Sequence, residues 1–139
     1  MREEDDMEKY QEKVYFIGAG PGDPELITVK GQRLVKEADI IIYAGSLVPK
    51  QVIDCHNEGA EIYNSASMTL EEVVSVMKEG IFSGKKVARV HTGDPAIFGA
   101  HREQMDLLDE YGIDYEVIPG VSSFLASAAA IKKEFTLPN

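Results

Sequence analysis

Residues 14–24, VYFIGAGPGDP, decide the fold: a short apolar run ends in a loop that holds three glycines and two prolines. An apolar run of this length bounded by glycine is typical of a buried strand. Glycines let a ligand approach the backbone closely, so the loop is a candidate binding site. It is not a dinucleotide fingerprint, because Asp23 stands where the third glycine belongs, and it lacks the lysine of a phosphate-binding loop. The plainer alternative is a strand-to-helix turn with Asp23 as helix N-cap.

Beyond this loop, apolar runs alternate with helical patterns. Further strands are expected at 40–43, 60–63, 87–90 and 115–118. Helices are expected after the first loop, with Ile27, Leu34, Val35 and Ala38 on one face, and at about 49–56, 70–81, 98–110 and 121–131. Strands this apolar are expected to be buried on both faces, as in a parallel sheet. The alternation predicts an α/β fold with a mostly parallel five-stranded sheet flanked by helices.

The helix at 70–81 has the clearest pattern. Its apolar residues recur at helical spacing and form a single stripe: Leu70, Val73, Val74, Met77 and Ile81. Thr69 followed three residues later by Glu72 predicts a capping box at its start.

In an α/β fold, ligands bind at the loops that follow the carboxyl ends of the strands. The loop at 91–95 is one of these. There Asp94 is a candidate partner for an ammonium group or ribose hydroxyls, or a helix cap ahead of Pro95. His91 is a candidate general base, although a structural role is the commoner fate of a lone histidine at a strand end. Arg89 is expected to meet either a substrate carboxylate or an internal acid.

The loop at 119–123 offers Ser122 and Ser123 at the start of a helix, either as ligand donors or as plain caps. Cys55 beside His56 is too isolated to indicate a nucleophile and its base. As the single cysteine, Cys55 cannot form an internal disulfide and has no partners at metal-ligand spacing, so no metal site and a reduced, cytoplasmic setting are expected.

The formal net charge is −10, which makes binding to nucleic acid or an anionic membrane surface unfavourable. No apolar run reaches the roughly 20 residues of a membrane-spanning helix. Residues 1–13 hold six acidic and three basic side chains, and we expect them to form a mobile leader ahead of a domain at 14–139.

Four segments, GAGPGDPELITVKG, ADIIIYAGSLV, RVHTGDPAIFGAHREQM and VIPGVSS, follow in this order from residue 18. Together they resemble the tetrapyrrole methylases from about Val14 to the end of the chain. The resemblance implies the N-terminal domain of that family, with the family's second domain absent from this chain. It also implies a tetrapyrrole substrate, a homodimer, and S-adenosylmethionine bound between the two domains.

The cofactor contacts implied by the resemblance are carried over by matching motif positions: Pro21, Thr92, Gly93, Asp94, Ile97, Ser122 and Ser123. YAGSLV and RVHTGDPAIFGA look most similar to the branch that methylates precorrin-4 or cobalt-precorrin-4 at C11 in cobalamin biosynthesis. The uroporphyrinogen branch has an acid where this chain has Ala44, so that substrate is disfavoured and no catalytic residue is assigned. Another methylase of the family, or a non-catalytic half that needs a partner chain, is the alternative. The fragment alone is expected to be inactive.

Overall fold

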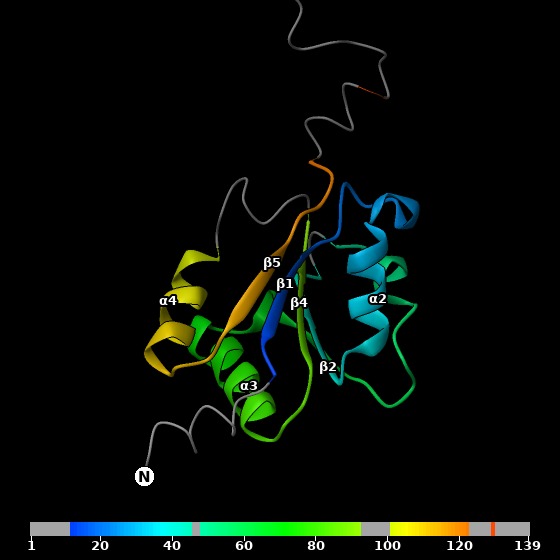
Figure 1. Ribbon diagram of the computed structural model, residues 1–139. Helices are drawn as coiled ribbons and strands as arrows, with labels where there is room; N and C mark the ends of the chain where they lie inside the picture. The colour runs from blue at the N-terminus through cyan, green and yellow to red at the C-terminus, as the bar shows by residue number, and fades with distance from the viewer. Residues whose placement is uncertain (1–11, 46–47, 93–100, 123–128, 130–139) are drawn as a thin grey trace, which may run out of the picture.

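The computed structural model describes residues 12–45, 48–92, 101–122 and 129. Five strands form one sheet: β1 (Val14–Gly18), β2 (Ile40–Tyr43), β3 (Glu61–Asn64), β4 (Val87–His91) and β5 (Tyr115–Ile118). Their order in the sheet is β3-β2-β4-β1-β5, and every neighbouring pair is parallel. The predicted α/β fold with a five-stranded sheet is therefore confirmed, and the sheet is parallel throughout. All carboxyl ends meet at one edge, the upper edge in Figure 1.

Helices cover both faces of this sheet. α2 (Val29–Glu37) lies on one face, whereas α3 (Leu70–Phe82) and α4 (Arg102–Glu110) lie on the other (Figure 1). Three short 3₁₀ turns connect the elements: η1 (Pro24–Leu26), η2 (Lys50–Ile53) and η3 (Ser65–Ser67). The helix expected at about 49–56 is thus the turn η2. The start expected near 98, and almost all of the helix expected at 121–131, fall outside the described residues.

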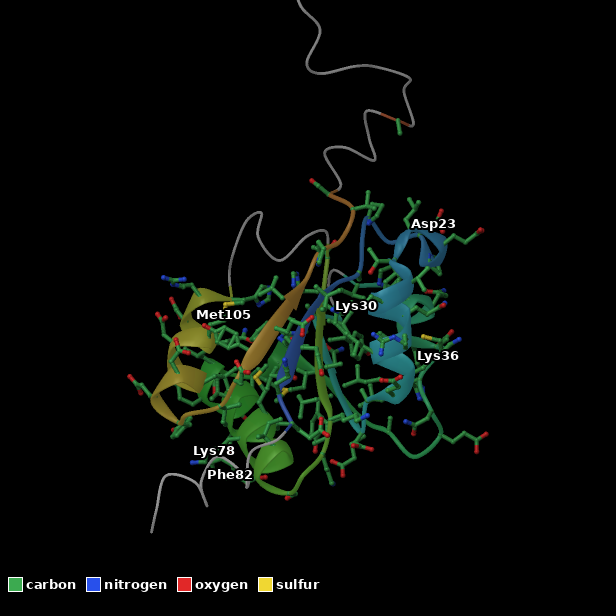
Figure 2. The ribbon with its side chains drawn as sticks, in the orientation of Figure 1. Asp23, Lys30, Lys36, Lys78, Phe82 and Met105 are labelled. Carbon is green, nitrogen blue, oxygen red and sulfur yellow. The ribbon has the colours of Figure 1, made fainter. Side chains whose placement is uncertain are left out.

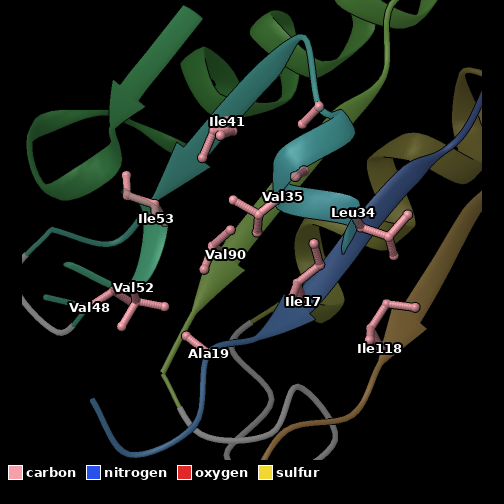
Figure 3. Close-up of a cluster of buried hydrophobic side chains, with 12 residues drawn as sticks. Ile17, Ala19, Leu34, Val35, Ile41, Val48, Val52, Ile53, Val90 and Ile118 are labelled. Atoms are coloured by element: carbon pink, nitrogen blue, oxygen red, sulfur yellow. The ribbon is translucent and has the colours of Figure 1, made fainter. Parts of the chain in front are cut away.

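The core is divided between the two faces because side chains alternate along each strand. Ile17 and Ile41 pack beneath α2 with Val35, Val90 and other residues, as Figure 3 shows. Their neighbours Phe16 and Ile42 point the other way and pack against α3 and α4. The strands β1, β2 and β4 supply buried side chains to both layers. The expectation that the strands are buried on both faces is therefore confirmed for these three.

The helix α3 begins with the predicted capping box. The Thr69 hydroxyl accepts from the Glu72 amide at 3.1 Å, and the Glu72 carboxylate accepts from the Thr69 amide at 3.0 Å. This reciprocal pair satisfies two amides that have no partner within the helix. The apolar stripe of α3 faces the sheet, with Val73, Val74, Met77 and Ile81 buried.

Two expectations are wrong. Ile27 does not belong to the first helix: its backbone is extended (φ −78°, ψ 146°), and α2 begins after Thr28, whose hydroxyl caps the Gly31 amide. Ile27 still packs against the core cluster under α2. The strands β3 and β5 are not buried on both faces, because they lie at the two edges of the sheet. Three of the four residues of β3 are exposed, and only Ile118 of β5 is buried.

Candidate functional site

The candidate site lies at the carboxyl ends of β1, β4 and β5, and these three strands are neighbours in the sheet. The loops after these strands contain Pro21, Thr92 and Ser122, the described members of the predicted contact set. The Ala19 amide donates to the His91 carbonyl at 2.7 Å, and the Thr92 hydroxyl donates to the Gly20 carbonyl at 3.5 Å. The first two loops are therefore joined through their backbones. Ser122 is buried, with 4% of its surface exposed.

The first loop has a tightly constrained backbone. Gly20 has φ +76°, and a Cβ atom on it would come within 2.8 Å of the Leu26 carbonyl oxygen. This position therefore requires glycine for both its conformation and its space. Asp23 at the top of Figure 2 caps η1, because its carboxylate accepts from the Glu25 amide at 2.9 Å. The helix-cap interpretation of Asp23 is confirmed.

The remaining predicted contacts, Gly93, Asp94, Ile97 and Ser123, lie outside the described residues. Their roles stay predictions. The chain on either side is described: His91 ends β4 and His101 is the N-cap residue of α4.

Arg89 is buried beneath this edge of the sheet, with 6% of its surface exposed. Its Nε donates to the Gln104 side-chain oxygen at 3.3 Å, and its Nη1 donates to the carbonyls of Ile42 and Val90 at 3.4 Å. These partners are all neutral, so no internal acid pairs with Arg89 among the described residues, and the contact with a substrate carboxylate stays a prediction. Burial lowers the pKa of Arg89 to about 10, and the guanidinium is still charged at neutral pH.

Two histidine rings lie beside Arg89. The ring centroids of His91 and His101 are 3.9 Å apart, and both residues are buried. Phe16 backs the His101 ring at 5.7 Å. Burial, followed by the nearby His91 and Arg89, lowers the pKa of His101 to about 3, so this ring is neutral at physiological pH. The His91 ring is itself buried and packs against His101. This arrangement is that of a structural residue rather than of a base that faces solvent.

The sequence analysis did not identify His101 or Gln104. His101 lies ten residues after His91, and only the return of α4 to β4 brings the rings together. A useful signal would have been the spacing of His101 and Gln104, two polar residues three positions apart at the start of a helix. The strand before this helix carries the polar residues Arg89 and His91.

The loop after β2 is held by the end of β3. The Asn64 side-chain oxygen accepts from the Gly45 amide at 3.1 Å and from the Ala66 amide at 3.0 Å. The Ala44 amide donates to the Val90 carbonyl at 3.3 Å, so Ala44 sits beside the carboxyl end of β4. The position where the uroporphyrinogen branch has an acid is thus occupied by a methyl group close to the candidate site.

Three other basic side chains, Lys30, Arg33 and Arg102, pair with acidic residues of this chain. Lys30 lies 2.6 Å from Glu116, and Arg33 is paired with an acid one turn along α2. Both line a cavity of about 220 Å³ with Tyr15 and Lys86, at the amino ends of β1 and β4 and therefore opposite the candidate site. Arg102 pairs with an acid on the exposed face of α4.

The described residues offer neither a metal site nor a membrane-spanning helix. Within residues 12–45, 48–92 and 101–122, no three His, Cys, Asp or Glu side chains are grouped so as to hold a metal ion. Across the same part of the chain, no helix has the length and apolar character needed to cross a bilayer. Burial raises the pKa of the Cys55 thiol, which disfavours its reactive thiolate.

Comparison with known proteins identifies the family of the chain. The family model described as Tetrapyrrole (Corrin/Porphyrin) Methylases matches residues 13–139. The cobalt-precorrin-4 C(11)-methyltransferase of Methanocaldococcus jannaschii is 59% identical over 126 residues, which cover 91% of this chain and 49% of that protein. The chain thus spans about half the length of this relative.

Two solved structures share the fold. A cobalt precorrin-4 methyltransferase matches with a TM-score of 0.88 and 53% identity, over 91% of this chain and 53% of the other. A uroporphyrin-III C-methyltransferase from Thermus thermophilus, in complex with S-adenosyl homocysteine, matches with a TM-score of 0.71 and 38% identity, over 84% of this chain and 48% of the other. The chain belongs to the tetrapyrrole methylase family.

Proposed function

We propose that this chain forms the N-terminal half of an S-adenosylmethionine-dependent methyltransferase that acts at C11 of precorrin-4 or cobalt-precorrin-4 in cobalamin biosynthesis. The observation that carries the proposal is that the loops after the adjacent strands β1 and β4, which contain Pro21 and Thr92, are joined by hydrogen bonds at the carboxyl ends of those strands. The cobalt-precorrin-4 C(11)-methyltransferase of Methanocaldococcus jannaschii is 59% identical to the chain over the 126 residues that match. The expected homodimer and cytoplasmic location stay predictions.

The described residues fit a cofactor of this kind. The Gly20 turn and the proline after it give the first loop a fixed course, and the Thr92 hydroxyl holds that loop from β4. S-adenosylmethionine would supply the methyl group through its sulfonium. Because positive charge on sulfur disperses as the methyl leaves, alignment of the reactants and exclusion of water are the main contributions asked of the protein.

The choice of substrate rests on the loop after β2. Uroporphyrinogen enzymes of the family have an acid at the position of Ala44, and here the side chain at that position carries no charge. We therefore propose a corrin-pathway substrate whose methylation does not use a carboxylate from this loop. The sequence similarity to precorrin-4 and cobalt-precorrin-4 enzymes supports the same choice.

The test is a methyl-transfer assay on this chain extended by the second half of the Methanocaldococcus jannaschii relative. Methylation of cobalt-precorrin-4 or precorrin-4, with little turnover of uroporphyrinogen III, is expected. Preference for uroporphyrinogen III would contradict the assignment of substrate. Saturable micromolar binding of NAD or ATP would instead indicate a nucleotide-binding module.

The alternative is a non-catalytic half that works only with a partner chain. Supplying the second half as a separate polypeptide distinguishes the two ideas. If the two halves are one catalytic unit, S-adenosylhomocysteine should bind when both are present, and this chain alone should show little turnover. Rapid turnover by this chain alone would show that the cofactor does not need a second domain.

A further inference from the structure

The buried imidazole of His101 has no role in the proposed methyl transfer, yet it lies directly beneath the candidate site. We propose that His101 is a positioning residue, which acts through His91 to fix the two loops that carry Pro21 and Thr92. The effect on cofactor binding rests on the proposed function. The effect of His101 on the two loops does not, and it can be tested on this chain alone.

A short series of contacts leads from His101 to the first loop. The His101 ring lies against the His91 ring, with centroids 3.9 Å apart. The carbonyl of His91 accepts from the Ala19 amide at 2.7 Å, and the next residue, Thr92, donates to the Gly20 carbonyl. Pro21 follows immediately. Any shift of the His91 backbone would therefore move both loops together.

Two side chains at the start of α4, from its N-cap residue and its first turn, contact β4. His101 contacts His91, and three residues later Gln104 accepts from Arg89 at 3.3 Å. Residues at i and i+3 lie on the same helix face, so one face of α4 meets two side chains of β4 that lie on the same face of the sheet. Phe16 of β1 closes the space behind the His101 ring. The end of β4 is thus located by contacts from a helix and from a neighbouring strand.

A core of aliphatic side chains would be more stable at this place. Burying imidazole and guanidinium groups costs free energy that Leu or Val would not, and buried polar groups are retained in some proteins because they specify one arrangement. The described titratable groups facing the His101 ring are Arg89 and His91 of β4, and both lower the pKa of His101. The His101 ring therefore positions β4 by packing as a neutral, flat ring against His91, and not by forming an ion pair.

The first experiment uses the 139-residue chain and amide hydrogen exchange measured by NMR. His101→Ala removes the ring, His101→Phe keeps a flat neutral ring, and Val73→Ala truncates a buried side chain on α3 as the matched control. We expect His101→Ala to speed exchange of the Ala19 amide at least tenfold relative to Val73→Ala. His101→Phe should leave that exchange close to wild type. If the alanine variant does not fold, His101→Leu, which fills the space without a flat ring, replaces it.

The second experiment measures S-adenosylhomocysteine affinity by calorimetry after extension of each variant by the second half of the relative. His101→Ala should raise the Kd at least tenfold, and His101→Phe and Val73→Ala should change it less than threefold. Unchanged Ala19 exchange in His101→Ala would overturn the inference, as would unchanged affinity in a protein that binds the ligand. If Ala19 exchange responds as expected but even the wild type binds no ligand, the positioning role is supported and the proposed function fails.

Discussion

Replacing His101 with phenylalanine should make folding less sensitive to acid. Only 8% of the surface of His101 is exposed, and its pKa is lowered to about 3. A histidine in an unfolded chain has a pKa near 6.5. Between these values the unfolded chain binds a proton that the folded chain does not. The free energy of unfolding therefore falls as the pH falls from about 6.5 toward 3, and it is unaffected by this group well above 6.5.

The size of the effect follows from the pKa difference. Each pH unit within this window changes the free energy of unfolding by up to about 1.4 kcal/mol. From pH 7 to pH 5, His101 alone should cost about 2 kcal/mol, because the unfolded chain becomes almost fully protonated at this ring. A loss of this size is a large share of the ~5–15 kcal/mol that stabilises an ordinary domain.

The assay is urea unfolding at pH 7, 6 and 5 for the wild type, His101→Phe and the control Met105→Leu. Met105 lies on the same helix and does not titrate, so its replacement should shift the stability by nearly the same amount at every pH. The difference between wild type and His101→Phe should change by about 2 kcal/mol across the range. A difference that is constant with pH would refute a neutral, buried His101, and so would protonation of its ring above pH 5 in the NMR spectrum of the folded chain.

Three further predictions concern other residues. Asp94→Ala, in the chain extended by a second domain, should weaken S-adenosylhomocysteine binding by more than about 1.4 kcal/mol, and unchanged affinity in calorimetry would contradict its role. Asn57 donates to two backbone carbonyls at the end of α2, at 3.2 and 2.9 Å, so Asn57→Ala should lower the free energy of unfolding in urea by about 1–2 kcal/mol. Gly20→Ala should destabilise the chain more than Gly84→Ala, because both have positive φ but only the Gly20 position meets a backbone atom, the Leu26 oxygen at 2.8 Å; equal losses in thermal unfolding would contradict this.

Much of the fold follows from local patterns. The runs at 14–17 and 40–43 are continuous and mostly apolar because both strands supply side chains to both layers of the core. The start of α3 was predictable for a different reason. A Thr and a Glu three residues apart satisfy one another's backbone amides through purely local contacts.

The errors arose where tertiary position overrides local pattern. Ile27 fits the apolar face of a helix, but the chain needs an extended residue between η1 and the Thr28 cap, and Ile27 reaches the same core from there. The segment β3 contains apolar residues, but its place at the edge of the sheet is set by strand order, which no local pattern encodes. Its exposure therefore could not be inferred from its composition.

The candidate site divides in the same way. The placement of the loops that contain Pro21 and Thr92 could be predicted because parallel strands bring their following loops to one end of the sheet, whatever the order of the strands. The choice of individual residues within those loops came from the family resemblance. The pairing of His91 with His101 could not be predicted, because it depends on where α4 packs across β4. That position is set by tertiary packing of residues such as Leu108. A residue that binds a ligand directly can be recognised from the sequence of the loop that contains it. A residue that positions such a loop carries its signal only in the contacts of the folded chain, and for this reason His101 becomes recognisable only when the ring contact with His91 is known.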